Sequence, residues 1–271
     1  MAVLGANSWG KSEVRVSKVH RGDLTDDFSD VTVSVRLEGD VDAAHTEGDT
    51  QNVLPTDTMR NTIYGLAQEH LTKDLEGFGV ILAEHFLSRG FVDQADVKLE
   101  ERVWQRETGT GFLGGGSVRR SARIRRGKGS HTRGGVAGLV VLKTRGSAFT
   151  GFPKDQFTIL PEKDDRLLAT SISAEWEYSE MPEDTAATWG LVCRTMIDSF
   201  FSETSASVQH QGYLMGEAVV GAVAEISEIS FHLPNQHHLD FDLTRFGLPD
   251  HGVVFHPVTE PYGDITLTVR R

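Results

Sequence analysis

The sequence predicts an α+β protein made of antiparallel sheets, each covered on one face by helices. Two patterns indicate this class: apolar and polar residues alternate in several segments, and four other segments carry apolar residues at helical spacing. The order strand, strand, helix, helix, strand, strand occurs twice, with the join near residues 130–137. The chain is therefore expected to fold as two similar modules, over residues 1–135 and 136–271.

The first module starts with a hairpin. Residues 30–37 alternate Val or Leu with polar side chains, which is typical of a half-buried strand, and 11–20 is its less regular partner. Apolar stripes predict helices over 56–71 and 75–88. Strand alternation returns over 97–104.

The second module repeats this order. Its single cysteine, Cys193, excludes an intramolecular disulfide and lies on an apolar helical stripe, so we expect a core residue rather than a nucleophile. The predicted elements are strands over 138–143 and 167–178, helices over 183–201 and 208–227, and strands over 229–233, 237–243 and 264–269.

Charge and hydropathy narrow the class of partner. The chain has 27 Lys and Arg against 39 Asp and Glu, a formal charge of −12, whereas a general binder of nucleic acid or acidic membranes carries a basic surface. The N-terminus lacks the pattern of a signal peptide, and no apolar run reaches the about eighteen residues of a membrane span. A soluble cytoplasmic protein without nucleic-acid or membrane partners is expected.

Two loop-like motifs are better explained by turns than by ligands. Gly109-Thr-Gly-Phe-Leu-Gly114 matches a dinucleotide fingerprint, but no helical stripe follows it and no acidic residue stands about twenty positions on. We expect a mobile hairpin loop there. Seven basic residues between Arg119 and Arg133 are expected to form a solvated hairpin on this acidic protein.

A histidine and aspartate cluster near residue 237 has the composition of a metal site. In a regular strand His237 faces away from the other members, so a solvent stripe with one inward histidine is favoured over a three-ligand site. The cluster comprises His232, His237, His238, Asp240 and Asp242.

The segment Leu54-Pro-Thr-Asp-Thr58 is the most informative one. It places hydroxyls and a carboxylate at a predicted helix start, where backbone N–H groups are free to bind a ligand. Taken alone, Thr56 or Asp57 would simply cap the helix.

Further motifs give this segment a second interpretation, because together they resemble the urate oxidase (uricase) family from about Asn7 to Val269. The matching segments stand in family order. They are Trp9-Gly-Lys-Ser-Glu-Val-Arg-Val16, Gly48-Asp49, Pro55-Thr-Asp-Thr58, Asn61-Thr62, Ser147-Ala-Phe-Thr-Gly-Phe152, Asp165-Arg-Leu-Leu-Ala-Thr170, Ser207-Val-Gln209 and Leu233-Pro-Asn-Gln-His-His238.

The resemblance implies oxidation of urate by molecular oxygen and water to 5-hydroxyisourate and hydrogen peroxide, in purine degradation, with neither cofactor nor metal. It implies a proton relay of Lys11, Thr56 and His237, and Asn235 as a residue that holds oxygen or water. The implied urate-binding groups are the side chains of Phe149, Leu160, Arg166 and Gln209 and the backbone N–H groups of Asp57 and Val208.

The same resemblance implies the tunnelling fold, in which two modules per subunit join those of a second subunit in a barrel and two barrels stack as a homotetramer. The active sites would lie between subunits. Two alternatives stay open at this point: a metal-dependent tunnelling-fold enzyme of the cyclohydrolase type acting on a purine or pterin, and a purine-binding tetramer with impaired catalysis.

Overall fold

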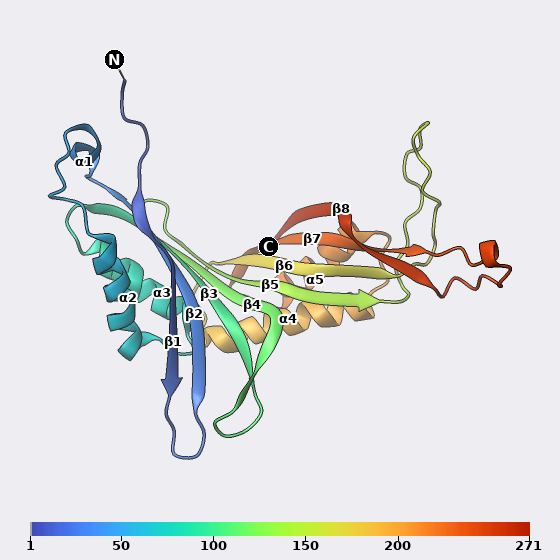
Figure 1. Ribbon diagram of the computed structural model, residues 1–271, viewed down its shortest axis with the longest axis horizontal. Helices are drawn as coiled ribbons and strands as arrows, with labels where there is room; N and C mark the ends of the chain where they lie inside the picture. Colours follow the sequence, from blue (N-terminus) through green and yellow to red (C-terminus); the bar gives the residue numbers. More distant parts are fainter. Residues whose placement is uncertain (1) are drawn as a thin grey trace. The chain divides into compact units, whose positions relative to one another are not determined.

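A computed structural model describes residues 2–271, and it confirms the α+β class (Figure 1). Its eight strands follow one another in sequence order in the sheet, and the described neighbouring pairs are antiparallel. The chain divides into two compact units. Unit 1 runs up to Val136 and includes Trp176–Gly190, and unit 2 comprises Ala137–Glu175 and Leu191–Arg271.

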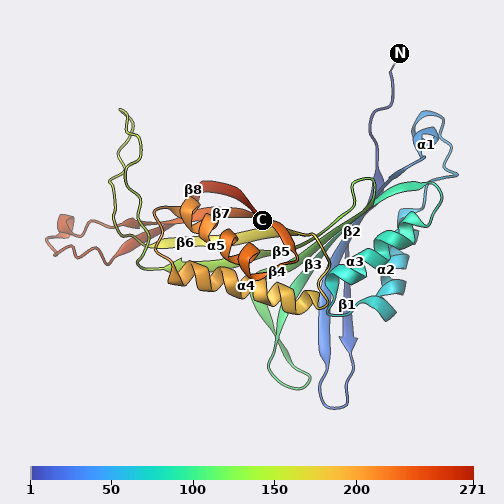
Figure 2. The same cartoon turned by 180° about the vertical axis from the view of Figure 1, so that it is seen from behind.

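Helices cover one face of the strands in each unit. In unit 1, α2 packs on β1 and α3 packs on β3 and β4; in unit 2, α5 packs on β7 and β8 (Figures 1 and 2). The elements are β1 (Trp9–His20), β2 (Asp27–Gly39), α1 (Asp42–Thr46), α2 (Thr56–His70), α3 (Leu75–Leu87), β3 (Val92–Arg106), β4 (Phe112–Gly127), β5 (His131–Lys143), β6 (Leu168–Tyr178), α4 (Thr185–Ser202), α5 (Val208–Ala222), β7 (Ile226–Asp240), the 3₁₀ turn η1 (Thr244–Phe246) and β8 (Phe255–Arg270).

Alternation in the sequence predicted the cores of the strands but not their full lengths. Strand β4 was not predicted, because its glycines and arginines lack an alternating apolar set. The glycine motif 109–114 lies in the β3–β4 hairpin and opens no helix, and the basic segment 119–133 forms parts of β4 and β5. The helix expected over 208–227 ends at Ala222, and β7 is one continuous strand rather than two.

The apolar faces predicted for the strands do form the core of unit 1. The alternating residues of β2, from Val31 to Leu37, are almost fully buried beneath α2 and α3, together with Met59 and Phe78 from those helices. In unit 2 Cys193 is buried, as expected of a core residue. In the described part of the chain, no helix is long and apolar enough to cross a membrane.

Strand β1 contains a β-bulge that the irregular sequence pattern reflects. Lys11 pairs with Val35 and Val14 pairs with Val33, so three steps on β1 match two on β2. Glu13, inside the bulge, has a left-handed φ of 59°, an uncommon conformation for a residue other than glycine. The bulge places Lys11 and Val14 on the same, helix-covered face of the sheet, which a regular strand would not do.

A second interruption lies between β3 and β4. Arg102 pairs with Arg119, but the next described pair is Trp104 with Gly114. Four residues of β4 are thus inserted opposite one residue of β3, and the ladder resumes beyond them.

Helix α5 approaches its strands closely because of two glycines. A Cβ atom added to Gly212 would lie 2.7 Å from the Leu267 side chain, and one added to Gly216 would lie 2.4 Å from Val269. The spacing of four residues puts both glycines on one face of the helix. Larger residues would push α5 away from β8.

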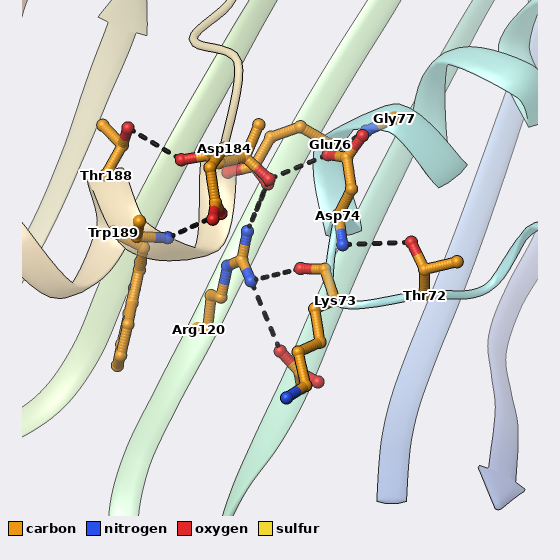
Figure 3. Close-up of polar contacts among 12 residues, drawn as sticks. Thr72, Lys73, Asp74, Glu76, Gly77, Arg120, Asp184, Thr188 and Trp189 are labelled. Carbon is orange, nitrogen blue, oxygen red and sulfur yellow. Dashed lines mark hydrogen bonds and ion pairs between the residues drawn. The ribbon is translucent and has the colours of Figure 1, made fainter. Parts of the chain in front are cut away.

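Unit 1 also buries a polar network at the start of α3 (Figure 3). The Arg120 guanidinium forms an ion pair with Glu76 and donates to the backbone oxygen of Lys73 and to Thr185 Oγ1. Thr185 Oγ1 donates in turn to Asp74 Oδ1, the N-cap of α3. Burial raises the pKa of Glu76, and Arg120 opposes that rise.

Candidate active site

The residues expected to form the site fall into two groups, one in each unit. In unit 2, a pocket of about 570 Å³ collects five of them. They come from the loop after β5, the segment before β6, and β7: Phe149, Leu160, Arg166, Asn235 and His237.

Arg166 is the most distinctive residue of this pocket. Its guanidinium lies over the ring of Phe149, 5.2 Å from the centroid, and its Nε is buried without a hydrogen-bond partner among the described residues. Burial lowers the pKa of Arg166. Since a buried unpaired donor costs free energy, this geometry favours an anionic ligand that accepts from Arg166.

Backbone hydrogen bonds fix Arg166 and Phe149 next to each other. The Arg166 N–H donates to Ser147 O at 2.7 Å, and Phe149 and Lys163 exchange N–H···O bonds of 2.8 and 3.1 Å. The ring of Phe149 stacks on Phe152 with a centroid distance of 4.8 Å. The pocket therefore has a rigid aromatic wall beside a cation.

Asn235 and His237 flank an interruption of the β7–β8 ladder. Asn235 pairs with Gly263, whereas His237 pairs with Val258, so Gln236 is left opposite four residues of β8. Both side chains are half-buried, and neither hydrogen-bonds another residue of the chain between positions 2 and 271. The interruption leaves an amide and an imidazole available to a ligand or water in the pocket.

Val208 and Gln209 begin α5, in the same unit but outside the lining of the pocket. Val208 is buried and Gln209 is exposed. Ser207 caps the helix by accepting from the His210 N–H at 3.1 Å. Because a helix leaves its first N–H groups without intrahelical partners, the Val208 N–H has no partner within α5.

Thr56 and Asp57 begin α2 in unit 1, and both are exposed. The capping interpretation was wrong: the N-cap is Pro55, and no side chain caps this helix. Asp57 instead pairs with Arg60 at 2.6 Å and accepts from Asn61 Nδ2 at 3.1 Å, so its carboxylate is turned along the helix. The N–H groups at this helix start remain uncapped, as a ligand-binding start requires.

Trp9 precedes Lys11 by two positions, so the two side chains lie on the same face of β1. The Trp9 indole N–H donates to Leu54 O at 3.2 Å, which ties the start of β1 to the segment that leads into α2. Through the bulge, Lys11 is thus directed to the sheet face that α2 covers.

The histidine and aspartate cluster does not come together. Two of its members have other partners: His232 pairs with Asp264 at 2.7 Å and Asp240 with Lys163 at 2.6 Å. Within residues 2–271, no three His, Cys, Asp or Glu side chains are placed to hold a metal ion.

No pattern in the sequence predicts the Lys163–Asp240 ion pair, although both residues line the pocket. They are 77 positions apart, and neither stands in a motif whose spacing predicts a contact. Only the fold brings them together.

One family model matches the chain twice, over residues 7–131 and 132–266, and its description is uricase. The chain belongs to the uricase family. The uricase of Arthrobacter globiformis is 38% identical over 99% of this chain and 90% of the relative, and that of Dictyostelium discoideum is 33% identical over 100% and 98%.

The fold agrees with that of a solved uricase. The crystal structure of the Arthrobacter globiformis uricase superposes with a TM-score of 0.96 at 37% identity, covering 100% of this chain and 96% of that one. Membership of the uricase family thus rests on both sequence and fold over nearly the whole length.

Proposed function

We propose that this chain oxidises urate with molecular oxygen and water to 5-hydroxyisourate and hydrogen peroxide, without a cofactor, in purine degradation. The observation that carries the proposal is the Arg166 guanidinium, held against the Phe149 ring with a buried Nε that lacks a partner among residues 2–271. Urate is a flat anion with donors and acceptors on its edges. Membership of the uricase family supports this substrate over other planar anions.

In the proposed complex, Arg166 binds one edge of urate bidentately, as a planar guanidinium can. The amide of Gln209 supplies a donor and an acceptor to the same edge. Phe149 stacks on the purine face and Leu160 forms an apolar wall. The backbone N–H groups of Asp57 and Val208 complete the edge contacts.

The proposed reaction needs a path for protons, because urate loses two protons and two electrons while oxygen is reduced to hydrogen peroxide. We assign this path to Lys11, Thr56 and His237, with Asn235 holding oxygen and then water above the ring. A lysine that shares a proton with a hydroxyl and an imidazole can serve as general base when its surroundings favour the neutral amine. Water then adds to the oxidised purine to give 5-hydroxyisourate.

Assembly completes the proposal. The chain is proposed to consist of two tunnelling-fold modules, residues 1–135 and 136–271, and to form a homotetramer in the cytoplasm whose sites lie between subunits. Lys11 and Thr56 of one subunit would face Arg166 of another. An isolated monomer would therefore be inactive, and diluting the protein below its assembly concentration should abolish turnover.

The test follows oxygen, urate and peroxide in one reaction. Purified protein treated with a chelator should consume urate and oxygen in equal amounts and release one equivalent of hydrogen peroxide. Tight urate binding without turnover would favour the impaired purine-binding tetramer. Activity that disappears with the chelator and returns with zinc would favour the metal-dependent alternative.

A further inference from the structure

Lys143, near the end of β5, is a buried lysine outside the proposed site. Its Nζ donates to Gln211 Oε1 at 2.6 Å and to Glu203 O at 2.8 Å, and lies 5.2 Å from the centroid of the Phe200 ring. Burial lowers the pKa of Lys143. Burying a charged amine costs free energy, and hydrogen bonds to well-placed acceptors offset that cost. The Lys143 ammonium therefore holds its acceptors, Gln211 Oε1 and Glu203 O, in fixed positions.

The two acceptors bracket the α4–α5 connection, residues 203–207. Glu203 is its first residue, and Gln211 lies in the first turn of α5, two residues beyond Gln209. Gln211 also donates to Ser199 O in α4 at 3.4 Å. One ammonium group thus ties the end of one helix to the beginning of the next.

The same connection is hydrogen-bonded to the loop after β5. The Ala148 N–H donates to Ser205 O at 2.8 Å, and the Ser205 N–H donates to Gly146 O at 3.0 Å. Between them, Ser147 O accepts from the Arg166 N–H at 2.7 Å. A displacement of the connection would therefore be passed to the backbone that carries Arg166.

We propose that Lys143 is a positioning residue for the substrate: it fixes the α4–α5 connection so that Gln209 and Arg166 meet the same edge of one ligand. This inference rests on the proposed function for the identity of that ligand. Lys143 itself touches neither substrate nor reacting atoms. Its effect passes through Gln211 and Glu203 to the start of α5.

The experiment compares Lys143→Met, which keeps the apolar stem, with Lys143→Arg, which keeps the charge and donors. In Lys143→Met we expect the KM for urate to rise about tenfold, since hydrogen bonds to charged groups are worth more than neutral ones, while kcat changes less than about threefold. Lys143→Arg should stay within about threefold of the wild type in both. Lys128→Met, at an exposed lysine, is the matched control.

A readout independent of the substrate accompanies the kinetics. Amide hydrogen exchange over residues 203–211 should accelerate in Lys143→Met and not in Lys128→Met. Gln211→Leu removes one of the two acceptors. It should raise KM and accelerate exchange as Lys143→Met does, but by a smaller factor. It also replaces Lys143→Met should that variant fail to fold.

The outcomes separate the two proposals. A Lys143→Met protein with wild-type KM and wild-type exchange would overturn the positioning role, even if its thermal stability fell. A Lys143→Arg protein whose kcat falls and whose KM rises by the same factor would also overturn the positioning role. A wild-type protein that does not turn over urate would refute the proposed function, and the exchange data would still show whether Lys143 holds the connection.

Discussion

The guanidinium of Arg166 lies over the ring of Phe149, with its carbon 5.2 Å from the ring centroid. The contact compensates in part for the buried Nε that lacks a partner among residues 2–271. A planar anion would compete for both groups at once, offering acceptors to the cation and a face to the ring. The pair is thus prepared for the chemistry of its proposed ligand.

Removal of the guanidinium should act on substrate binding. Arg166→Ala should raise the KM for urate about a hundredfold, because a bidentate charge-assisted contact of about 3 kcal/mol is lost, with a smaller effect on kcat. Arg166→Lys should recover only part of the loss, because an ammonium lacks the planar pair of donors. Steady-state kinetics measure both, and an unchanged KM in Arg166→Ala would remove this residue from the site.

The relay residues should act on turnover instead. Lys11→Ala and Thr56→Ala should each lower kcat by about 10²-fold or more, as expected when a proton-transfer group is removed, with KM changed by only a few-fold. Thr58→Ala, at an exposed threonine two residues along α2, is the matched control and should behave as wild type. Equal, small effects in all three variants would contradict the relay.

Removal of the bulge in β1 should keep Lys11 on its present face of the sheet. Deletion of Ser12 leaves two steps on β1 against two on β2, so regular alternation then places Lys11 and Val14 on the same, helix-covered face. The deletion variant should therefore fold, as judged by circular dichroism, and keep more turnover than Lys11→Ala. Turnover as low as that of Lys11→Ala would show that the bulge itself, and not only the face of the strand, positions Lys11.

The buried network of unit 1 should matter for stability. Arg120→Met leaves Glu76 without its partner in the interior and should lower the free energy of unfolding by about 3 kcal/mol. Arg194→Met removes an exposed arginine from α4 and should change the free energy of unfolding by less than about 0.5 kcal/mol. Urea denaturation at fixed protein concentration measures both, and equal midpoints would contradict the assignment.

A carboxylate in β2, that of Asp30, should make the free energy of unfolding depend on pH in the acid range. Arg15 hydrogen-bonds Asp30 through two contacts of 2.7 and 2.5 Å and holds the pKa of that carboxyl below its usual value. Its stabilisation is present above the unfolded pKa, near 3.8, and is lost as the pH falls through the lower folded pKa. Asp30→Asn should therefore cost about 2 kcal/mol at pH 7, and the gap to wild type should narrow below pH of about 4.

The sequence predicted the repeated order of elements because long apolar stripes and alternation survive in single segments. It could not predict β4, whose side chains are mostly polar, or the continuity of β7 through Pro234 and the interruption beside Gln236. Local patterns report burial on one face, whereas ladder interruptions depend on the partner strand.

The candidate site was found in the sequence through motifs rather than through periodicity. Five of its residues line one pocket. Lys143 and the Lys163–Asp240 pair could not be predicted, because their contacts join positions far apart in the chain. Capping of α2 was predicted from residue types and failed, since Pro55 stands at the cap and Asp57 pairs with Arg60.

The two ladder interruptions have a consequence for the design of new sites. Each lies where the third strand of a half meets the fourth, at Arg102–Trp104 in one half and at Asn235–His237 in the other, and the same family model matches both halves. Arg102 and Trp104 thus stand in the first half where the second half has an amide and an imidazole. Substitutions at these two positions are therefore a route to engineering a second site on a backbone interruption of the same kind.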